Sequence, residues 1–161
     1  MKHHPLKTIT IFGTRPEVIK LFPVLAKLGQ DDLFDSIVVS TSQHREMIDD
    51  LFELFSLKVD HDLDIMQDTQ SLIEISIRAL SGIDPLLTRY KPDLVLVQRD
   101  TTSAFMAALA AFYHKIPIGH VEAGLRSFDK MHPYPEEINR RLISPLISLH
   151  FAPTIQNAKN L

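Results

Sequence analysis

The 161 residues are enough for a single domain that buries most of its apolar surface, and 45% hydrophobic and 23% charged residues are typical of a globular protein and exclude a disordered chain. A net charge of −3 argues against a nucleic-acid partner, and the absence of cysteine excludes disulfides and thiolate chemistry. No apolar run approaches the roughly 18 residues of a membrane span, and residues 1–5 lack the apolar core of a signal peptide, so we expect a cytoplasmic protein without a membrane partner.

Apolar runs typical of strands alternate with helical patterns along the first half of the chain. This alternation is typical of βαβ units around a parallel sheet. Residues 59–65 alternate apolar residues with aspartates and predict a short edge strand or an extended loop. The other elements of this half are strands over 8–12 and 36–40 and helices over 16–30 and 45–55. The first helix is expected to bury a face made of Val18, Ile19, Phe22, Leu25 and Ala26.

The second half of the chain continues the same pattern. Residues 70–89 predict a long helix, bent near Gly82 and Pro85. Residues 93–97 are almost all apolar, as expected of a strand that helices cover on both faces. We further expect helices over 101–114 and 136–148, the latter kinked or ended by Pro145, strands over 117–121 and 149–152, and the start of a helix over 154–161. Together these elements predict a doubly wound parallel α/β sheet of the Rossmann-like class.

The turn after the first predicted strand reads Gly-Thr-Arg-Pro-Glu, beginning at Gly13. Thr14 and Glu17 fit a capping box at the start of a helix. Backbone N–H groups left free at such a start, together with the helix dipole, attract phosphate. Arg15 adds a guanidinium suited to phosphate oxygens, and Lys20 lies little more than a turn further on. The sequence therefore predicts an anion-binding turn, although neither the dinucleotide fingerprint nor a P-loop is present.

Acidic residues follow two further predicted strands. Ligands of open α/β sheets bind outside the carboxyl ends of the strands, so these positions are candidates for a site. Asp100 comes after the strand at 93–97, where it either caps the next helix or faces a ligand. Glu122 follows the strand at 117–121. Because a carboxylate is costly to bury alone, Glu122 either lies in a cleft or pairs with Arg126.

Two more acidic residues open the helix predicted from residue 136. Glu136 and Glu137 lie in its first turn, where the dipole favours negative charge, and Glu136 can pair with Arg140 four residues later. The scattered histidines show no spacing of a metal site, and no nucleophile elbow is present. An anion-binding turn with several carboxylates along one sheet edge suits a phosphorylated sugar that undergoes acid–base chemistry.

Six short segments carry a family resemblance. They are Phe-Gly-Thr-Arg-Pro-Glu-Val-Ile-Lys at 12–20, Gln-His-Arg at 43–45, Asp-Thr-Thr at 100–102, Gly-His-Val-Glu-Ala-Gly-Leu-Arg at 119–126, Pro-Glu-Glu-Ile-Asn-Arg at 135–140 and His-Phe-Ala-Pro-Thr at 150–154. Each is modest alone, but their joint occurrence in this order closely resembles the non-hydrolysing UDP-N-acetylglucosamine 2-epimerases of bacteria. The resemblance runs over essentially the whole chain.

The resemblance implies a two-domain, glycosyltransferase-B-like enzyme of cell-envelope polysaccharide biosynthesis. Such an enzyme interconverts UDP-N-acetylglucosamine and UDP-N-acetylmannosamine without a metal or nicotinamide cofactor. The implied route eliminates UDP to give 2-acetamidoglucal, and adds UDP back after the proton returns to the other face of C2. By resemblance the substrate contacts are Arg15, Lys20, Asp100, Glu122 and Arg140. The acid–base candidates are Asp100, Glu122 and Glu136, with no role assigned to each.

Two departures from the family's pattern stand out. Gln98 and Arg99 stand where the family usually has His-Gly, and a residue other than glycine costs about 1 kcal/mol at Arg99 if φ is positive there. Arg99 either fills part of the cleft or binds an anion itself. The family also continues into a second domain with most uridine and diphosphate contacts, including a catalytic histidine. We therefore expect residues 1–161 to be an amino-terminal Rossmann-like domain, with the second, nucleotide-binding domain absent.

Three hypotheses about function remain open. In the first, the chain is the amino-terminal half of a split epimerase that needs a separately encoded carboxy-terminal domain. In the second, which Gln98 and Arg99 favour, it is a non-catalytic remnant or a sugar-phosphate-binding or interaction domain. In the third, which the epimerase motifs disfavour, it is a glycosyltransferase-related half-domain. A homodimer is also expected, because the family forms dimers and an isolated half exposes apolar surface.

Overall fold

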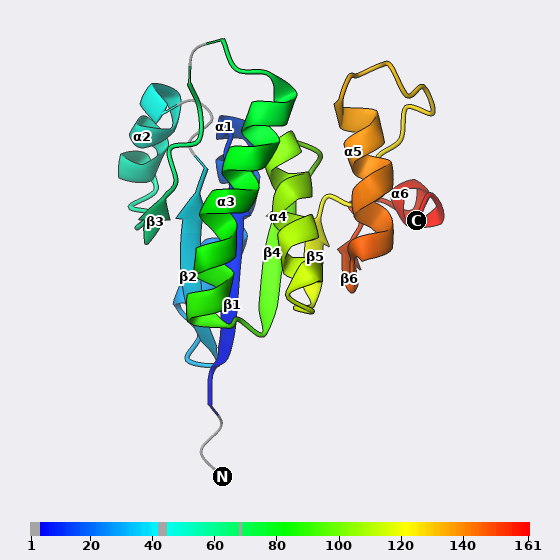
Figure 1. Ribbon diagram of the computed structural model, residues 1–161. Helices are drawn as coiled ribbons and strands as arrows, with labels where there is room; N and C mark the ends of the chain where they lie inside the picture. The colour runs from blue at the N-terminus through cyan, green and yellow to red at the C-terminus, as the bar shows by residue number, and fades with distance from the viewer. Residues whose placement is uncertain (1–3, 42–44, 68) are drawn as a thin grey trace.

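A six-stranded parallel sheet forms the centre of the molecule (Figure 1). The computed structural model describes residues 4–41, 45–67 and 69–161. The strand order is β3-β2-β1-β4-β5-β6, and each neighbouring pair is parallel. The strands are β1 (Leu6–Phe12), β2 (Phe34–Ser40), β3 (His61–Asp62), β4 (Leu94–Gln98), β5 (Ile118–Val121) and β6 (Leu149–Phe151). This is the order of a Rossmann-like sheet, which confirms the predicted fold class.

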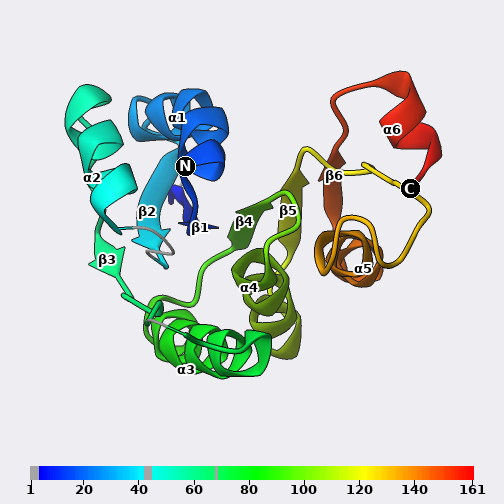
Figure 2. The ribbon, with the colours of Figure 1, turned by 90° about the horizontal axis from the view of Figure 1, so that it is seen from above.

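Helices cover both faces of the sheet (Figure 2). On one face lie α1 (Arg15–Gly29), α2 (Arg45–Leu54) and α6 (Ile155–Lys159), and on the other lie α3 (Leu72–Tyr90), α4 (Thr102–Tyr113) and α5 (Glu136–Ile143). A 3-10 turn, Ser144–Leu146, follows α5. Within the described residues, no helix has the length and apolar character that crossing a membrane requires.

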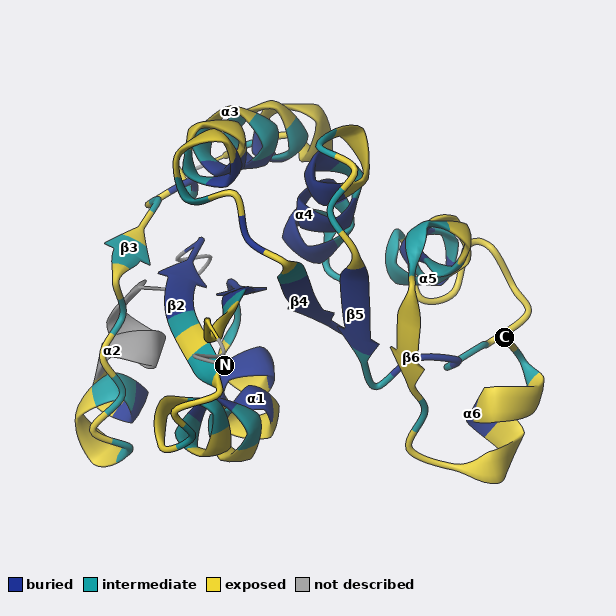
Figure 3. Cartoon of the chain, turned by 90° about the horizontal axis from the view of Figure 1, so that it is seen from below, coloured by how far each residue is buried: buried dark blue, intermediate teal, exposed yellow. Residues whose placement is uncertain are grey.

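Each face of the sheet has its own apolar core. Under α1 and α2 the buried cluster is Phe12, Val18, Leu21, Leu25, Val38 and Leu51. Under α3 and α4 a larger cluster joins the strands to Ile75, Ala79, Ile83 and Leu87 of α3 and to the alanines of α4. The central strands β4 and β5 are therefore buried, whereas β6 is an exposed edge strand (Figure 3).

The predicted elements are present, and the differences lie in their faces and ends. The predicted buried face of the first helix is wrong at Ile19, which is 47% exposed, and Leu21 is buried instead. Gly82 and Pro85 lie inside one continuous helix, α3. The helix predicted over 136–148 ends at Ile143, before the turn that contains Pro145. Of the predicted motifs, Gln43 and His44 lie outside the described residues.

The strand order places a crevice between β1 and β4. The chain leaves β1 toward α1 on one face of the sheet, and leaves β4 toward α4 on the other. Because the two connections diverge, a space remains beyond the carboxyl ends of β1 and β4, and this is where open α/β sheets bind ligands.

Candidate functional site

A pocket of about 390 Å³ lies at this crevice. Its walls come from the turn after β1, the turn after β4 and the amino-terminal end of α5. The lining residues are Thr14, Pro16, Arg99, Asp100, Thr101, Pro133, Glu136 and Arg140. Two of the three predicted acid–base residues and one predicted substrate-binding arginine therefore face one space.

In the turn after β1, backbone and hydroxyl donors form hydrogen bonds with the carboxylate of Glu17. Glu17 is 1% exposed, and its carboxylate accepts hydrogen bonds from the Gly13 N–H at 2.8 Å and the Thr14 N–H at 2.7 Å. The hydroxyl groups of Thr14 and Thr101 donate to the same carboxylate at 2.9 Å each. The Gly13 and Thr14 N–H groups are therefore not free to bind an anion, while the anion-binding turn as a whole stays a prediction.

The two predicted cations of this turn have different surroundings. Arg15 is exposed, does not line the pocket, and has no hydrogen bond or ion pair within the described part of the chain. Lys20 forms an ion pair with Glu122, its Nζ donating to Oε1. Arg15 is thus open to solvent beside the pocket, whereas Lys20 connects α1 to the end of β5.

The turn after β4 is capped by a residue other than its aspartate. The N-cap of α4 is Thr101, whose hydroxyl accepts from the Ala104 N–H at 3.1 Å, so the capping alternative for Asp100 is wrong. The Asp100 carboxylate instead accepts from Arg140, at 2.7 Å from Nε and 2.6 Å from Nη2. Both side chains are largely buried, at 5% exposure for Asp100 and 12% for Arg140. Such charge-assisted bonds fix both groups at the pocket wall.

Glu137 and Asn139 hold α5 in place behind this ion pair. Asn139 donates from Nδ2 to the Asp100 carbonyl at 2.8 Å. The fully buried Glu137 accepts from the Ser127 N–H, Arg140 and Arg141. Burial raises the pKa of Glu137, but these hydrogen bonds outweigh it and leave the pKa below its ordinary value. Glu137 is therefore a structural anion, and it orients the arginine that binds Asp100.

Glu122 ends β5 in a left-handed conformation with φ of 62°. It accepts from Gln98 Nε2 at 2.6 Å as well as from Lys20. The alternative pairing with Arg126 is wrong, because Arg126 donates to the Leu125 carbonyl and to Ser144 Oγ. Glu122 thus stands at the sheet edge among cationic and amide donors.

Arg99 also has a left-handed backbone, with φ of 63°. Its Nε lies 3.6 Å from Glu122 Oε2 and 4.0 Å from Asp100 Oδ1. The buried His120 lies 2.7 Å from the Arg99 carbonyl, and because a carbonyl only accepts, His120 Nε2 is the donor. Burial also lowers the pKa of His120. The condition under which a residue other than glycine is costly at this position is therefore met, since φ is positive at Arg99.

Glu136 faces the pocket without the predicted partner. Arg140 binds Asp100 and Glu137, so the pairing of Glu136 with Arg140 is wrong. Glu136 Oε2 is buried and has no hydrogen-bond partner within the described residues. In the same part of the chain, no group of three or more histidine or acidic residues is arranged to hold a metal ion.

The fold and the pocket together define a class of protein. A Rossmann-like sheet carries acidic groups and arginines at the diverging ends of β1 and β4, an arrangement suited to acid–base chemistry on a bound ligand. Residues 26–161 match the family described as UDP-N-acetylglucosamine 2-epimerase. The chain belongs to this family.

Named relatives agree with this assignment. The UDP-N-acetylglucosamine 2-epimerase of Yersinia pestis is 53% identical over 156 residues, which are 97% of this chain and 42% of the relative. The crystal structure of the Neisseria meningitidis enzyme bound to UDP-GlcNAc superposes with a TM-score of 0.93 at 51% identity, covering 96% of this chain and 42% of that one. This chain therefore spans about two fifths of the length of these relatives.

The fold extends beyond the family. Acinetobacter baumannii MurG superposes with a TM-score of 0.64 at 14% identity, over 91% of this chain and 40% of MurG. At that identity the likeness concerns the fold alone.

Proposed function

We propose that this chain provides the catalytic acids of a UDP-N-acetylglucosamine 2-epimerase. The observation that carries the proposal is the pocket between β1 and β4. There Asp100, held by Arg140, and the unpartnered Glu136 line one wall. Glu122 lies beside them, 3.6 Å from Arg99.

The chemistry of epimerisation at C2 matches these groups. In the proposed route a carboxylate removes the C2 proton as the C1–O bond to UDP breaks, which gives 2-acetamidoglucal and UDP. The proton then returns to C2 on the opposite face, and UDP adds back at C1. Two faces of one carbon need acid–base groups on two sides, and Asp100, Glu122 and Glu136 come from three different segments around the pocket.

The leaving UDP needs positive charge near its diphosphate. Arg15 is exposed and unpaired among the described residues, so its five donors are available to phosphate oxygens without breaking an internal contact. Lys20 follows on the same helix, bound to Glu122. We therefore assign the diphosphate to the side of the pocket formed by α1.

The length of the relatives completes the proposal. Because the chain spans 42% of the Yersinia pestis relative, we assign residues 1–161 to an amino-terminal domain and expect turnover only with a second, carboxy-terminal domain. We also place the protein in the cytoplasm, where UDP-sugars are the substrate pool.

Reconstitution tests this function. The chain is mixed with the remaining portion of the Yersinia pestis relative, and the conversion of UDP-N-acetylglucosamine is followed by proton NMR. We expect epimerisation in the mixture, and Glu122→Gln in this chain to reduce turnover about a hundredfold or more with little loss of stability. No turnover with any carboxy-terminal half refutes the proposal and leaves a sugar-phosphate-binding domain as the alternative.

Arg15→Ala tests the diphosphate side separately. We expect it to weaken binding of UDP about tenfold, because one charge-assisted contact is lost. Lys27→Ala, a change of another cation on the same helix, is the matched control, and equal effects of the two variants contradict the assignment.

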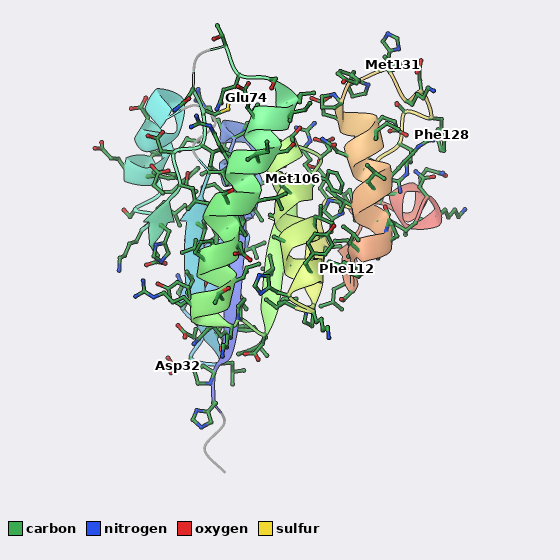
Figure 4. The ribbon with its side chains drawn as sticks, viewed as in Figure 1. Asp32, Glu74, Met106, Phe112, Phe128 and Met131 are labelled. Carbon is green, nitrogen blue, oxygen red and sulfur yellow. The ribbon has the colours of Figure 1, made fainter. Side chains whose placement is uncertain are left out.

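We further propose that the chain forms a homodimer through the outer face of α3 and α4. Ile73 and Ile77 lie one turn apart on α3 and are 72% and 58% exposed, and Tyr113 of α4 is 69% exposed. Phe112, which is 51% exposed, lies at the end of α4 (Figure 4). Exposed apolar groups of this kind mark association sites. Ile77→Glu should shift the mass measured by light scattering from dimer to monomer, and a wild-type monomer contradicts the proposal.

A further inference from the structure

Unpartnered polar atoms gather at the ends of β4 and β5. Seven buried side-chain nitrogen or oxygen atoms lack a hydrogen-bond partner within the described residues. Four of them belong to Gln98, Arg99, His120 and Glu136, at or beside the pocket. Buried polar groups are nearly always satisfied, so such a concentration points to a missing partner.

Two of these atoms, Arg99 Nε and Glu136 Oε2, belong to residues that line the same pocket. The first is a donor and the second, when the carboxyl is ionised, is an acceptor. A ligand that satisfies both must therefore offer an acceptor and a donor of its own.

Internal hydrogen bonds among the described residues do not satisfy Arg99 Nε. Asp100 is already bound by Arg140, and Glu122 by Gln98 and Lys20, all at hydrogen-bonding distance. Arg99 Nε lies at ion-pair distance from both carboxylates, 3.6 Å from Glu122 Oε2 and 4.0 Å from Asp100 Oδ1, but it forms a hydrogen bond with neither. Its side chain is 36% exposed, so part of the guanidinium reaches the pocket.

The backbone at Arg99 makes the presence of a side chain costly. A φ of 63° is strained for any residue with a Cβ, and glycine adopts it most readily. Strained residues of this kind gather at functional sites. At this position the residue is an arginine that lines the pocket, with Nε close to the Glu122 and Asp100 carboxylates.

We propose that Arg99 is a substrate-binding residue that recognises the acetamido group of the sugar. The Arg99 N–H donates to the acetamido carbonyl, and Glu136 accepts from the acetamido N–H. A negatively charged group of the ligand is disfavoured beside Arg99, because the carboxylates of Asp100 and Glu136 line the same wall of the pocket. A neutral amide satisfies both atoms without bringing in charge. The inference rests on the proposed function, since it takes the UDP-sugar as the ligand.

Nitrogen NMR spectra that include arginine Nε–H signals test the contact directly. This chain, combined with the carboxy-terminal portion of the Yersinia pestis relative, is titrated with UDP-N-acetylglucosamine and, in parallel, with UDP-glucose, which lacks the acetamido group. We expect the Arg99 Nε–H signal to shift and exchange more slowly with the first ligand only. Equal responses to both ligands overturn the inference, as does a spectrum in which Arg99 stays unchanged.

Binding of the two ligands to variants gives the second readout. Arg99→Gly should weaken UDP-N-acetylglucosamine binding about tenfold and leave UDP-glucose binding unchanged, since one charge-assisted hydrogen bond is lost. Arg99→Lys should lose the same contact while keeping the charge. Lys115→Gly is the matched control, because Lys115 also has a positive φ of 59° and lies outside the pocket lining.

The same titration separates the two proposals. If Arg15→Ala weakens binding of both ligands and Arg99→Gly changes neither, the proposed function stands and the role of Arg99 is wrong. If neither ligand shifts any signal of the pocket, both proposals are wrong.

Discussion

The turns after β1 and β4 have similar local structure, but their buried carboxylates have different bonding partners. Each leads from a buried strand into a helix with a threonine N-cap, Thr14 or Thr101, and each carries a buried carboxylate. Glu17, in the first, receives only backbone and hydroxyl donors. Asp100, in the second, receives an arginine from α5 and faces the pocket.

The difference shows that the bonding partner decides what a buried carboxylate does. Glu17 takes up donors that a ligand would otherwise meet, and through Thr101 it joins the two turns. Thr101 caps α4, so Asp100 is not the N-cap and the Asp100 carboxylate remains at the pocket wall. The two carboxylates also differ in position, because Glu17 lies three residues after the N-cap of α1 and Asp100 lies directly before the N-cap of α4.

Among the variants that test this difference between the two turns, Arg140→Met is expected to change the free energy of unfolding most. The change leaves Asp100 buried without its charge partner, which should lower the free energy of unfolding by about 3 kcal/mol or more. Urea unfolding measures the loss. Arg141→Met on the same helix is the control, and because Arg141 is 44% exposed it should cost less than about 1 kcal/mol. Equal losses contradict a special role for the Asp100–Arg140 pair.

Glu17→Gln is expected to cost about 2 kcal/mol. The amide replaces one acceptor oxygen with a donor, which then faces donors of the two turns. Glu74→Gln is the matched control, since Glu74 forms the same kind of capping box with Ser71 at the exposed start of α3. We expect a smaller loss for the control in the same urea measurements, and a reversed order refutes the structural role of Glu17.

Glu17 and Glu137 should contribute to the pH dependence of the free energy of unfolding with opposite signs. Burial raises the pKa of Glu17 above its ordinary 4.5, so its contribution is fully present below 4.5 and is lost as the pH rises through the raised pKa. The pKa of Glu137 is lowered, so its contribution is present above 4.5 and is lost as the pH falls through the folded pKa. Each group changes the free energy of unfolding by at most about 1.4 kcal/mol per pH unit.

Urea unfolding across the acidic range checks both signs. Glu137→Gln should flatten the curve of stability against pH on its acid side. Glu17→Gln should flatten it above 4.5. The opposite pattern contradicts the assignment of the two carboxylates.

The smallest effect is expected from Arg99→Gly. Relief of the left-handed backbone should raise the free energy of unfolding by up to about 1 kcal/mol, and Lys115→Gly should do the same. A clear loss of stability in Arg99→Gly alone means that the charge of Arg99 supports the fold. Thermal unfolding of the two variants distinguishes these outcomes.

The fold was accessible from the sequence because its signals are local. Strand runs, helical spacing and the alternation of the two predict a parallel doubly wound sheet without any knowledge of contacts. The helix ends that differ from the prediction, such as the end of α5 before Pro145, depend on single residues. Ile19 was misplaced because apolar character alone does not distinguish a buried position from an exposed one.

The partners within the site were less accessible, because they are set by distant segments. Glu136 and Arg140 have the spacing of a helical pair, yet Arg140 donates to Asp100, which lies 40 positions away in the sequence. The sequence predicts Glu17 as part of a capping box, but the bond between Glu17 and Thr101 depends on how β1 and β4 pair. The one sequence signal for these contacts was the excess of acidic residues, since buried carboxylates need donors.

The pairing of β1 with β4 has a consequence for the order of folding. Glu17 and Thr101 are 84 positions apart, whereas β1 and β2 are joined through one helix. Closing the longer loop costs more chain entropy, so contacts between β1 and β4 form after those between β1 and β2. We therefore expect the pocket to be among the last parts of the domain to assemble, and a ligand bound there to slow unfolding of the chain.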